Sequence, residues 1–113
     1  MAETGAITQT VLDYFEGWFE GDAERMERAL HPDLVKRQAG EALGTTTKAR
    51  MVELTEQGAG AGDAADGRIE VEVHDVYADT AAATVHIATY HEHLHLVRTA
   101  DGWKIANALW RFS

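Results

Sequence analysis

The chain has 113 residues, a formal charge of −9 and no cysteine. Disulfides, thiolate metal sites and cysteine nucleophiles are therefore excluded, and the negative charge argues against binding to nucleic acid or to anionic membrane surfaces. Apolar residues make up 45% and charged residues 26% of the sequence, which is typical of one globular domain over residues 1–113. No apolar run approaches the ~18 residues of a membrane span, and residues 1–4 lack the layout of a signal peptide, so we expect a cytoplasmic protein.

The first twenty residues have helical periodicity. Apolar side chains recur every three or four positions: Ile7, Val11, Tyr14, Phe15 and Trp18. This spacing predicts an amphipathic helix that ends at Gly21. Asp22 is a suitable N-cap for a second, short helix over residues 23–30. His31 and Pro32 end that helix, because a residue that precedes proline is disfavoured in the α region.

The middle of the chain has weaker signals. Residues 34–38 are a candidate for a short strand. Residues 45–57 predict a third helix, capped near Thr46 or Thr47. Gly, Ala and Asp fill most of residues 58–67, which indicates a flexible loop within one domain.

After this loop the period changes to that of strands. Residues 69–73 alternate between apolar and acidic, and the pattern slips near residues 75–76, which is typical of a bulge. Residues 78–80 resemble a turn, and residues 82–98 predict one long strand. Residues 99–102 suit a hairpin turn with glycine in the left-handed conformation. A last strand over 103–112 completes an antiparallel meander that follows the helices, which predicts the α+β class.

The order of elements and several short motifs resemble the nuclear transport factor 2-like superfamily, also known as the SnoaL or ketosteroid-isomerase-like fold. The motifs lie at residues 14–18, 21–22, 31–33, 94–98, 101–105 and 107–110. Over essentially the whole chain, the sequence is most similar to the small proteins of the "putative lumazine-binding" family. The resemblance implies a cone-shaped α+β barrel, with three N-terminal helices packed on a curved antiparallel sheet, a cavity between them and a homodimer formed through the outer sheet face. It implies no single function, because the superfamily includes isomerases, dehydratases, polyketide cyclases, epoxide hydrolases and binding modules.

Histidines concentrate on one predicted strand. His91, His93 and His95 alternate along the chain, so their side chains share one face of that strand. Imidazoles suit acid–base chemistry near neutral pH or contact with a ligand. Two of them on one face could bind a metal, and all three could instead be structural. No cysteine and no acid clearly shares their face, so we expect no metal and no cofactor.

The register of the last two strands decides what faces these histidines. A bulge at Gly102 would place His95 opposite Asn107 and His93 opposite Leu109. The same register would put Val97 and Ile105 on that face, which we expect to line the cavity. A two-residue turn would shift the pairing by one residue and put Leu94 opposite Leu109.

The remaining candidate residues come from the helices. In ketosteroid isomerases a tyrosine of the first helix donates to the oxyanion, so the resemblance implies that Tyr14 is a pocket donor. The isomerase base, an aspartate, has no counterpart in residues 34–38, where we expect Lys36 and Arg37 to be solvated. The candidate catalytic residues are Tyr14, His93 and His95. The candidate ligand-binding residues are Tyr14, Trp18, His31, His93, His95, Asn107 and Leu109.

Two main functions follow from these residues. One is a small-molecule-binding protein whose apolar cavity, lined by His, Asn and Tyr, holds a small hydrophobic or aromatic molecule. The other is a cofactor-independent isomerase, dehydratase or cyclase in which His95 or His93 is the base and Tyr14 the electrophilic donor. A third class is a dimeric partner module with a vestigial cavity. The missing strand acid favours binding. On the predicted long strand, Val85 and Ile87 fall on one face and Leu94 and Leu96 on the other, which favours a homodimer through the sheet.

Overall fold

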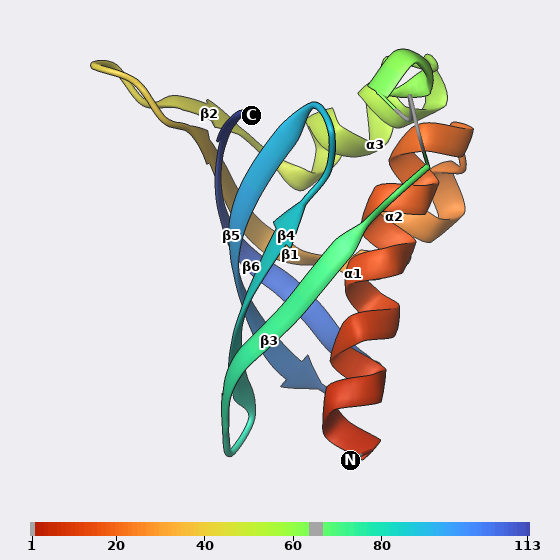
Figure 1. The fold of residues 1–113 in the computed structure, drawn as a ribbon. Coiled ribbons are helices and arrows are strands. Elements are labelled where there is room, and N and C mark those ends of the chain that lie inside the picture. The colour runs from red at the N-terminus through yellow and green to blue at the C-terminus, as the bar shows by residue number, and fades with distance from the viewer. Residues whose placement is uncertain (1, 64–66) are drawn as a thin grey trace.

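A computed structural model describes residues 2–63 and 67–113, in which helices cover one face of a curved sheet (Figure 1). The elements are α1 (Ala2–Glu20), α2 (Ala23–Ala29), β1 (Leu30–Gln38), β2 (Gly44–Thr46), α3 (Lys48–Glu56), the 3₁₀ turn η1 (Ala61–Asp63), β3 (Glu70–Tyr77), β4 (Thr80–His86), β5 (Tyr90–Thr99) and β6 (Gly102–Phe112). None of the helices in these residues is long and apolar enough to span a membrane. The α+β class is confirmed.

The sheet has the strand order β2-β1-β6-β5-β4-β3. All neighbouring strands are antiparallel except β1 and β6, which are parallel. Two details of the prediction are therefore wrong. The sheet is mixed, and the third helix is not N-terminal to it, because α3 follows β1 and β2 along the chain. The long segment between β1 and β6 makes the parallel pairing possible, since parallel neighbours need a crossover rather than a tight turn.

The predicted long strand over 82–98 is two strands joined by a turn at residues 87–89. The turn is closed by a hydrogen bond of 2.9 Å from the Ile87 amide to the Tyr90 carbonyl, and β4 and β5 then pair as a hairpin. Because the chain reverses here, Val85, Leu94 and Leu96 all face the helices and are buried. The apolar residues that were expected on two opposite faces, and that favoured a homodimer, therefore lie on one face of the sheet. The helices of this same chain cover that face.

Helix α1 lies along the concave face of the sheet and supplies much of the core. Its buried apolar residues are Ile7, Val11, Tyr14 and Phe15. The predicted caps are confirmed: the Asp22 side chain accepts from the Arg25 amide at the start of α2, and the Thr47 side chain accepts from the Arg50 amide at the start of α3. Both are the short polar residues that satisfy free amides at a helix N-terminus.

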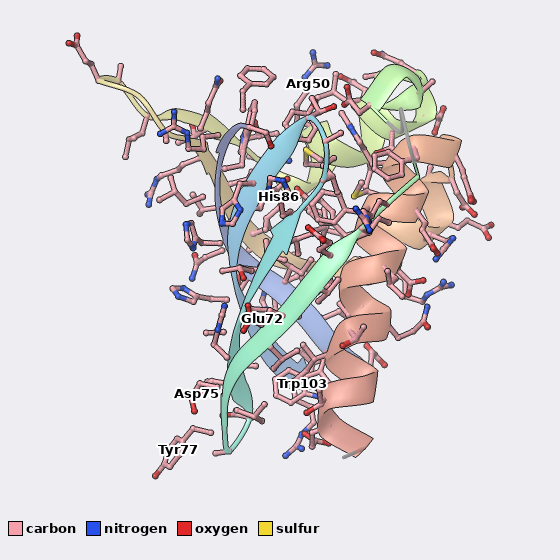
Figure 2. All side chains as sticks on the ribbon, in the orientation of Figure 1. Arg50, Glu72, Asp75, Tyr77, His86 and Trp103 are labelled. Atoms are coloured by element: carbon pink, nitrogen blue, oxygen red, sulfur yellow. The ribbon has the colours of Figure 1, made fainter. Side chains whose placement is uncertain are left out.

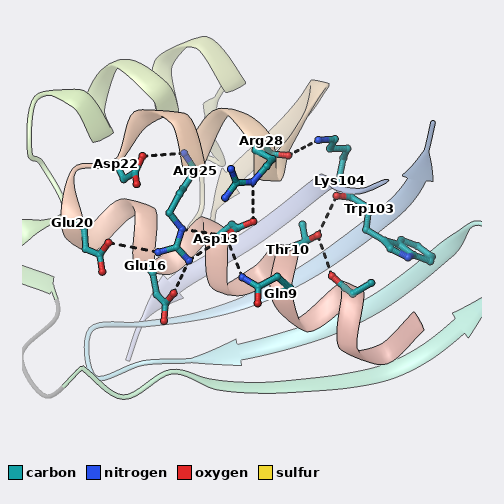
Figure 3. A network of polar contacts seen from close by, with 11 residues as sticks. Gln9, Thr10, Asp13, Glu16, Glu20, Asp22, Arg25, Arg28, Trp103 and Lys104 are labelled. Atoms are coloured by element: carbon teal, nitrogen blue, oxygen red, sulfur yellow. Dashed lines mark hydrogen bonds and ion pairs between the residues drawn. The ribbon is translucent and has the colours of Figure 1, made fainter. Parts of the chain in front are cut away.

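Ion pairs hold α2 against α1 (Figure 3). The buried Asp13 carboxylate accepts hydrogen bonds from Arg25 Nε over 3.1 Å and from Arg28 Nε over 3.2 Å. Arg25 also pairs with Glu16 over 2.6 Å. Burial alone would raise the pKa of Asp13, but the hydrogen bonds from Arg28 and Arg25 outweigh it and lower that pKa below its ordinary value.

A bulge in β6 sets the faces of the last hairpin. His95 pairs with Asn107 and His93 with Leu109, so the first of the two predicted registers is confirmed at the histidines. The extra residue is Ala106, however, and Thr99 pairs with Gly102. Side chains on either side of a bulge change parity. Ile105 therefore faces the helices and is fully buried, whereas the histidines lie on the opposite, outer face.

Candidate functional site

A pocket of about 100 Å³ lies between the helices and the concave face of the sheet. Its lining residues are Tyr14, Phe15 and Trp18 of α1, Lys36 of β1, Thr46 of β2, Met51 and Leu54 of α3, Tyr90 and Glu92 of β5, and Trp110 of β6. Most of these side chains are apolar or aromatic. Two opposite charges, Lys36 and Glu92, are enclosed among them.

Helical and strand periodicity bring these groups together. Tyr14 and Trp18 are four residues apart and so lie on one face of α1. Glu92 of β5 pairs with Trp110 of β6, and Trp110 in turn pairs with Gln38 of β1, two residues beyond Lys36. Alternation then points Lys36, Trp110 and Glu92 toward the helices from three adjacent strands.

The charged groups are joined through a tyrosine. Lys36 Nζ donates to Tyr14 Oη over 2.5 Å, and Tyr14 Oη donates to Glu92 Oε1 over 3.0 Å. Lys36 Nζ also lies 3.8 Å from Glu92 Oε2. Lys36 is 9% exposed and Glu92 is 1% exposed. Buried charges require such partners, because an unpaired charge in apolar surroundings is strongly unfavourable.

Burial shifts the pKa values of Lys36 and Tyr14. It lowers the pKa of Lys36, and the nearby Glu92 carboxylate offsets only part of that effect. Burial and the Glu92 carboxylate together raise the pKa of Tyr14 well above its ordinary value, so the phenol stays a neutral donor. Lys36 Nζ also lies 5.1, 5.6 and 5.9 Å from the ring centroids of Tyr14, Trp110 and Trp18, within the range of cation–π attraction.

Residues 58–63 contact two of the side chains that line the pocket, Trp18 and Tyr90. Asp63 Oδ2 accepts from Trp18 Nε1 over 2.9 Å and from the Tyr90 hydroxyl over 2.5 Å, which links α1 to β5. The pKa of Tyr90 is raised mainly by burial and, to a smaller extent, by its hydrogen bond to Asp63. A Cβ atom on Gly60 would lie 2.3 Å from the Trp18 carbonyl oxygen, so the two backbones meet in direct contact. Within the predicted loop, residues 61–63 form the 3₁₀ turn η1; positions 64–66 lie outside the described residues.

The other predicted site residues do not share this pocket. His93, His95, Asn107 and Leu109 border an open hollow on the outer sheet face, together with Val35, Arg37, Leu43 and Ala108. His31 lies elsewhere, at a surface hollow, where its Nδ1 accepts from the Asp33 amide over 3.0 Å. The expectation that the histidine face and the α1 aromatics line one cavity is wrong. The histidines alternate along β5 with the buried Glu92, Leu94 and Leu96, and the bulge at Ala106 places Asn107 on the same outer face.

The sequence analysis missed the charged pair of the pocket. Lys36 was expected to be solvated, but it is buried. Strand alternation offered a signal for both members, since Glu92 shares parity with the apolar Leu94 and Leu96, and Lys36 shares it with Leu34. Among the described residues, no three His, Asp or Glu side chains are arranged to hold a metal ion.

The comparisons with known proteins agree with this architecture. The family described as "Putative lumazine-binding" matches residues 2–111, and the chain belongs to this family. No curated protein matches the sequence.

Solved structures share the fold at low sequence identity. An NTF2-like protein of unknown function from Methylobacillus flagellatus KT has a TM-score of 0.77 and 16% identity, over 100% of this chain and 94% of that one. An NTF-2 like protein of unknown function from Silicibacter pomeroyi DSS-3 has a TM-score of 0.73 and 19% identity, over 97% and 95%. A ketosteroid isomerase-like protein from Erwinia carotovora atroseptica SCRI1043 has a TM-score of 0.62 and 17% identity, over 97% and 95%. These likenesses show the nuclear transport factor 2-like fold, as the sequence resemblance implied.

Proposed function

We propose that this protein binds a small hydrophobic or aromatic molecule in the pocket between α1, α3 and the sheet. The observation that carries the proposal is a partly enclosed space with aromatic walls on which a few polar groups converge, which is the usual form of a small-molecule site. A volume of about 100 Å³ is smaller than the ~150 Å³ cavity that holds benzene in another protein. The ligand, or the part of it that enters, is therefore small unless the half-exposed residues Thr46 and Leu54 move.

Lys36 gives the pocket a preference for ligands that accept hydrogen bonds. An ammonium group has three donors, and one of those of Lys36 is directed to Tyr14. A carbonyl or hydroxyl oxygen near Nζ would accept from another. The aromatic rings of Trp18 and Trp110 would bury the apolar part of the same ligand.

The proposal is tested by identifying what the pocket holds. Compounds released from the purified, denatured protein are identified by mass spectrometry, and binding is then measured on variants. We expect Trp18→Leu to weaken binding several-fold, and His95→Ala, on the outer face, to leave it unchanged. Loss of binding in His95→Ala with normal binding in Trp18→Leu would contradict the proposal and place the ligand in the outer hollow.

The acid–base alternative requires a different location for the substrate. His93 or His95 would act on a molecule bound in the outer hollow, beside Asn107 and Leu109. Tyr14 faces the other side of the sheet, so it would not be the electrophilic donor for the same molecule. The His95→Ala variant described above tests this alternative as well.

We also propose that the outer face forms a homodimer, as the family resemblance implies. Leu43 and Leu109 border the outer hollow and are 52% and 42% exposed, which is the kind of apolar surface that a second copy would cover. We expect light scattering to give a dimer mass at micromolar protein, and Leu109→Lys to reduce it to a monomer. Tyr77→Ser is the matched control, because Tyr77 is also exposed but points away from the molecule at the β3–β4 turn (Figure 2). A monomeric parent protein would contradict this part of the proposal.

A further inference from the structure

We propose that Lys36 is a nucleophilic amine that forms an imine with a small aldehyde or ketone bound in the pocket. This inference rests on the proposed function, because the carbonyl compound must first bind there.

The position of Lys36 separates it from the other two lysines of the chain. Lys48 Nζ pairs with Glu27 over 3.0 Å, and Lys104 Nζ donates to the Arg28 carbonyl over 2.6 Å, both outside the pocket. Lys36 Nζ alone points among aromatic rings at the pocket wall. A bound carbonyl carbon can therefore come within reach of this amine, while the apolar walls exclude bulk water.

An amine attacks a carbonyl only in its neutral form. Burial disfavours the ammonium form of Lys36, and the hydrogen-bonded chain from Lys36 through Tyr14 to Glu92 offers a route for its proton. Tyr14 passes its own proton to Glu92 Oε1 and takes one from Lys36 Nζ. The result is a neutral Lys36 amine and a neutral Glu92 acid, with no net charge moved into or out of the pocket.

The condensation then balances within these groups. The nitrogen lone pair of Lys36 forms a C–N bond, the carbonyl π pair moves to oxygen, and a proton shifts from nitrogen to that oxygen to give a carbinolamine. Glu92 returns its proton through Tyr14 to the hydroxyl group, the C–O bond breaks, and water leaves. The nitrogen lone pair forms the C=N bond of a protonated imine, whose positive charge again faces the Glu92 carboxylate.

The test uses butanal with cyanoborohydride, which reduces an imine to a stable secondary amine. Peptide mapping at early times should place the main lysine adduct on Lys36. Burial lowers the pKa of Lys36 and so raises the neutral fraction of its amine. We therefore expect Lys36 to be labelled faster than Lys48 and Lys104, which serve as controls within the same molecule. Equal or slower labelling of Lys36 would overturn the inference, and this comparison needs no variant.

Substitutions distinguish imine formation at Lys36 from simple binding of the carbonyl compound in the pocket. Lys36→Arg keeps the charge but cannot form an imine, so the pocket adduct should disappear. Tyr14→Phe and Glu92→Gln interrupt the proton route, so labelling of Lys36 should become slower and shift its pH profile. A purely structural role for these two residues would change stability but leave the labelling profile of the folded protein as it is, and that result would contradict the proton route.

Butan-1-ol, which lacks the carbonyl, reports on binding alone through NMR shifts of the indole N–H groups of Trp18 and Trp110. If the alcohol binds while butanal labels only surface amines, the imine inference is wrong and the proposed binding function stands. If the alcohol does not bind and Lys36 is not labelled, both are overturned for ligands of this size.

Discussion

Lys36 Nζ donates to Tyr14 Oη across 2.5 Å, and this bond links strand β1 to helix α1 inside an aromatic pocket. Tyr14 in turn donates to Glu92 on β5, which is separated from β1 by β6. One phenol group therefore connects the helix layer to two strands that are not paired with each other in the sheet.

The first prediction concerns this buried pair. Lys36→Met leaves the Glu92 carboxylate buried without its cation, so we expect the free energy of unfolding to fall by about 3–5 kcal/mol in urea denaturation at neutral pH. The double variant Lys36→Met/Glu92→Met removes both charges, and apolar replacement of a buried pair is often neutral or stabilising. It should recover most of the loss. A double variant that is less stable than Lys36→Met would contradict this account.

The second prediction concerns Gly60. A Cβ at this position would lie 2.3 Å from the Trp18 carbonyl oxygen and 2.5 Å from the Trp18 ring, so Gly60→Ala forces the loop away from α1. We expect a loss of about 1–3 kcal/mol, the usual effect of overpacking, and altered Trp18 fluorescence. Gly62→Ala is the matched control, because a Cβ there meets nothing within 4 Å. Equal effects of the two substitutions would refute the proposed contact.

Asp63 is the subject of the third prediction. It accepts hydrogen bonds from both Trp18 and Tyr90, and Asp63→Ala would leave these two donors without this partner. A loss of about 1–3 kcal/mol in unfolding free energy is expected. Asp75→Ala, at an exposed position of β3, should stay within about 0.5 kcal/mol of the parent protein. A Tyr90→Phe variant as costly as Asp63→Ala would show that the Trp18 bond contributes little.

The fourth prediction is a pH dependence. The pKa of Asp13 is lowered in the folded protein, so its carboxylate stabilises the fold above its unfolded pKa of about 3.9, and this stabilisation is lost as the pH falls through the folded pKa. At neutral pH, Asp13→Asn should cost about 1–3 kcal/mol through weakened bonds to Arg25 and Arg28. The difference between the two proteins should shrink as the pH is lowered through that window, as thermal unfolding at several pH values would show. A difference that is constant with pH would mean that the charge of Asp13 is not responsible.

The local elements could be predicted because their signals are short-range. The spacing of Ile7, Val11 and Tyr14 specifies α1, and Asp22 and Thr47 mark where α2 and α3 begin. The turn at 87–89 could not be found in this way, because residues with strand propensity continue into it. The parallel pairing of β1 with β6 joins distant segments, and no local pattern encodes it.

Helical periodicity predicted which α1 side chains line the pocket, whereas the expected faces of the sheet residues were wrong. Tyr14 and Trp18 reach the pocket because helical spacing fixes their common face. Whether Ile105 shares a face with Asn107 depends on the position of one extra residue, and the bulge lies at Ala106 rather than at the glycine that turn chemistry favours. In the sequence, Lys36 resembles a surface charge, because the residue that compensates its burial, Glu92, lies on a strand that is distant along the chain.

The contact between Gly60 and Trp18 also decides where the chain can be lengthened. A stretch of Gly and Ala looks like the natural place to insert an epitope or a spectroscopic reporter. Gly60, however, packs directly on Trp18, and Asp63 bonds to Trp18 and Tyr90, so added sequence there would disturb the link between α1 and β5. The β3–β4 turn is the better insertion point. Tyr77 is 77% exposed there, and the turn projects away from the pocket at the far end of the molecule (Figure 1).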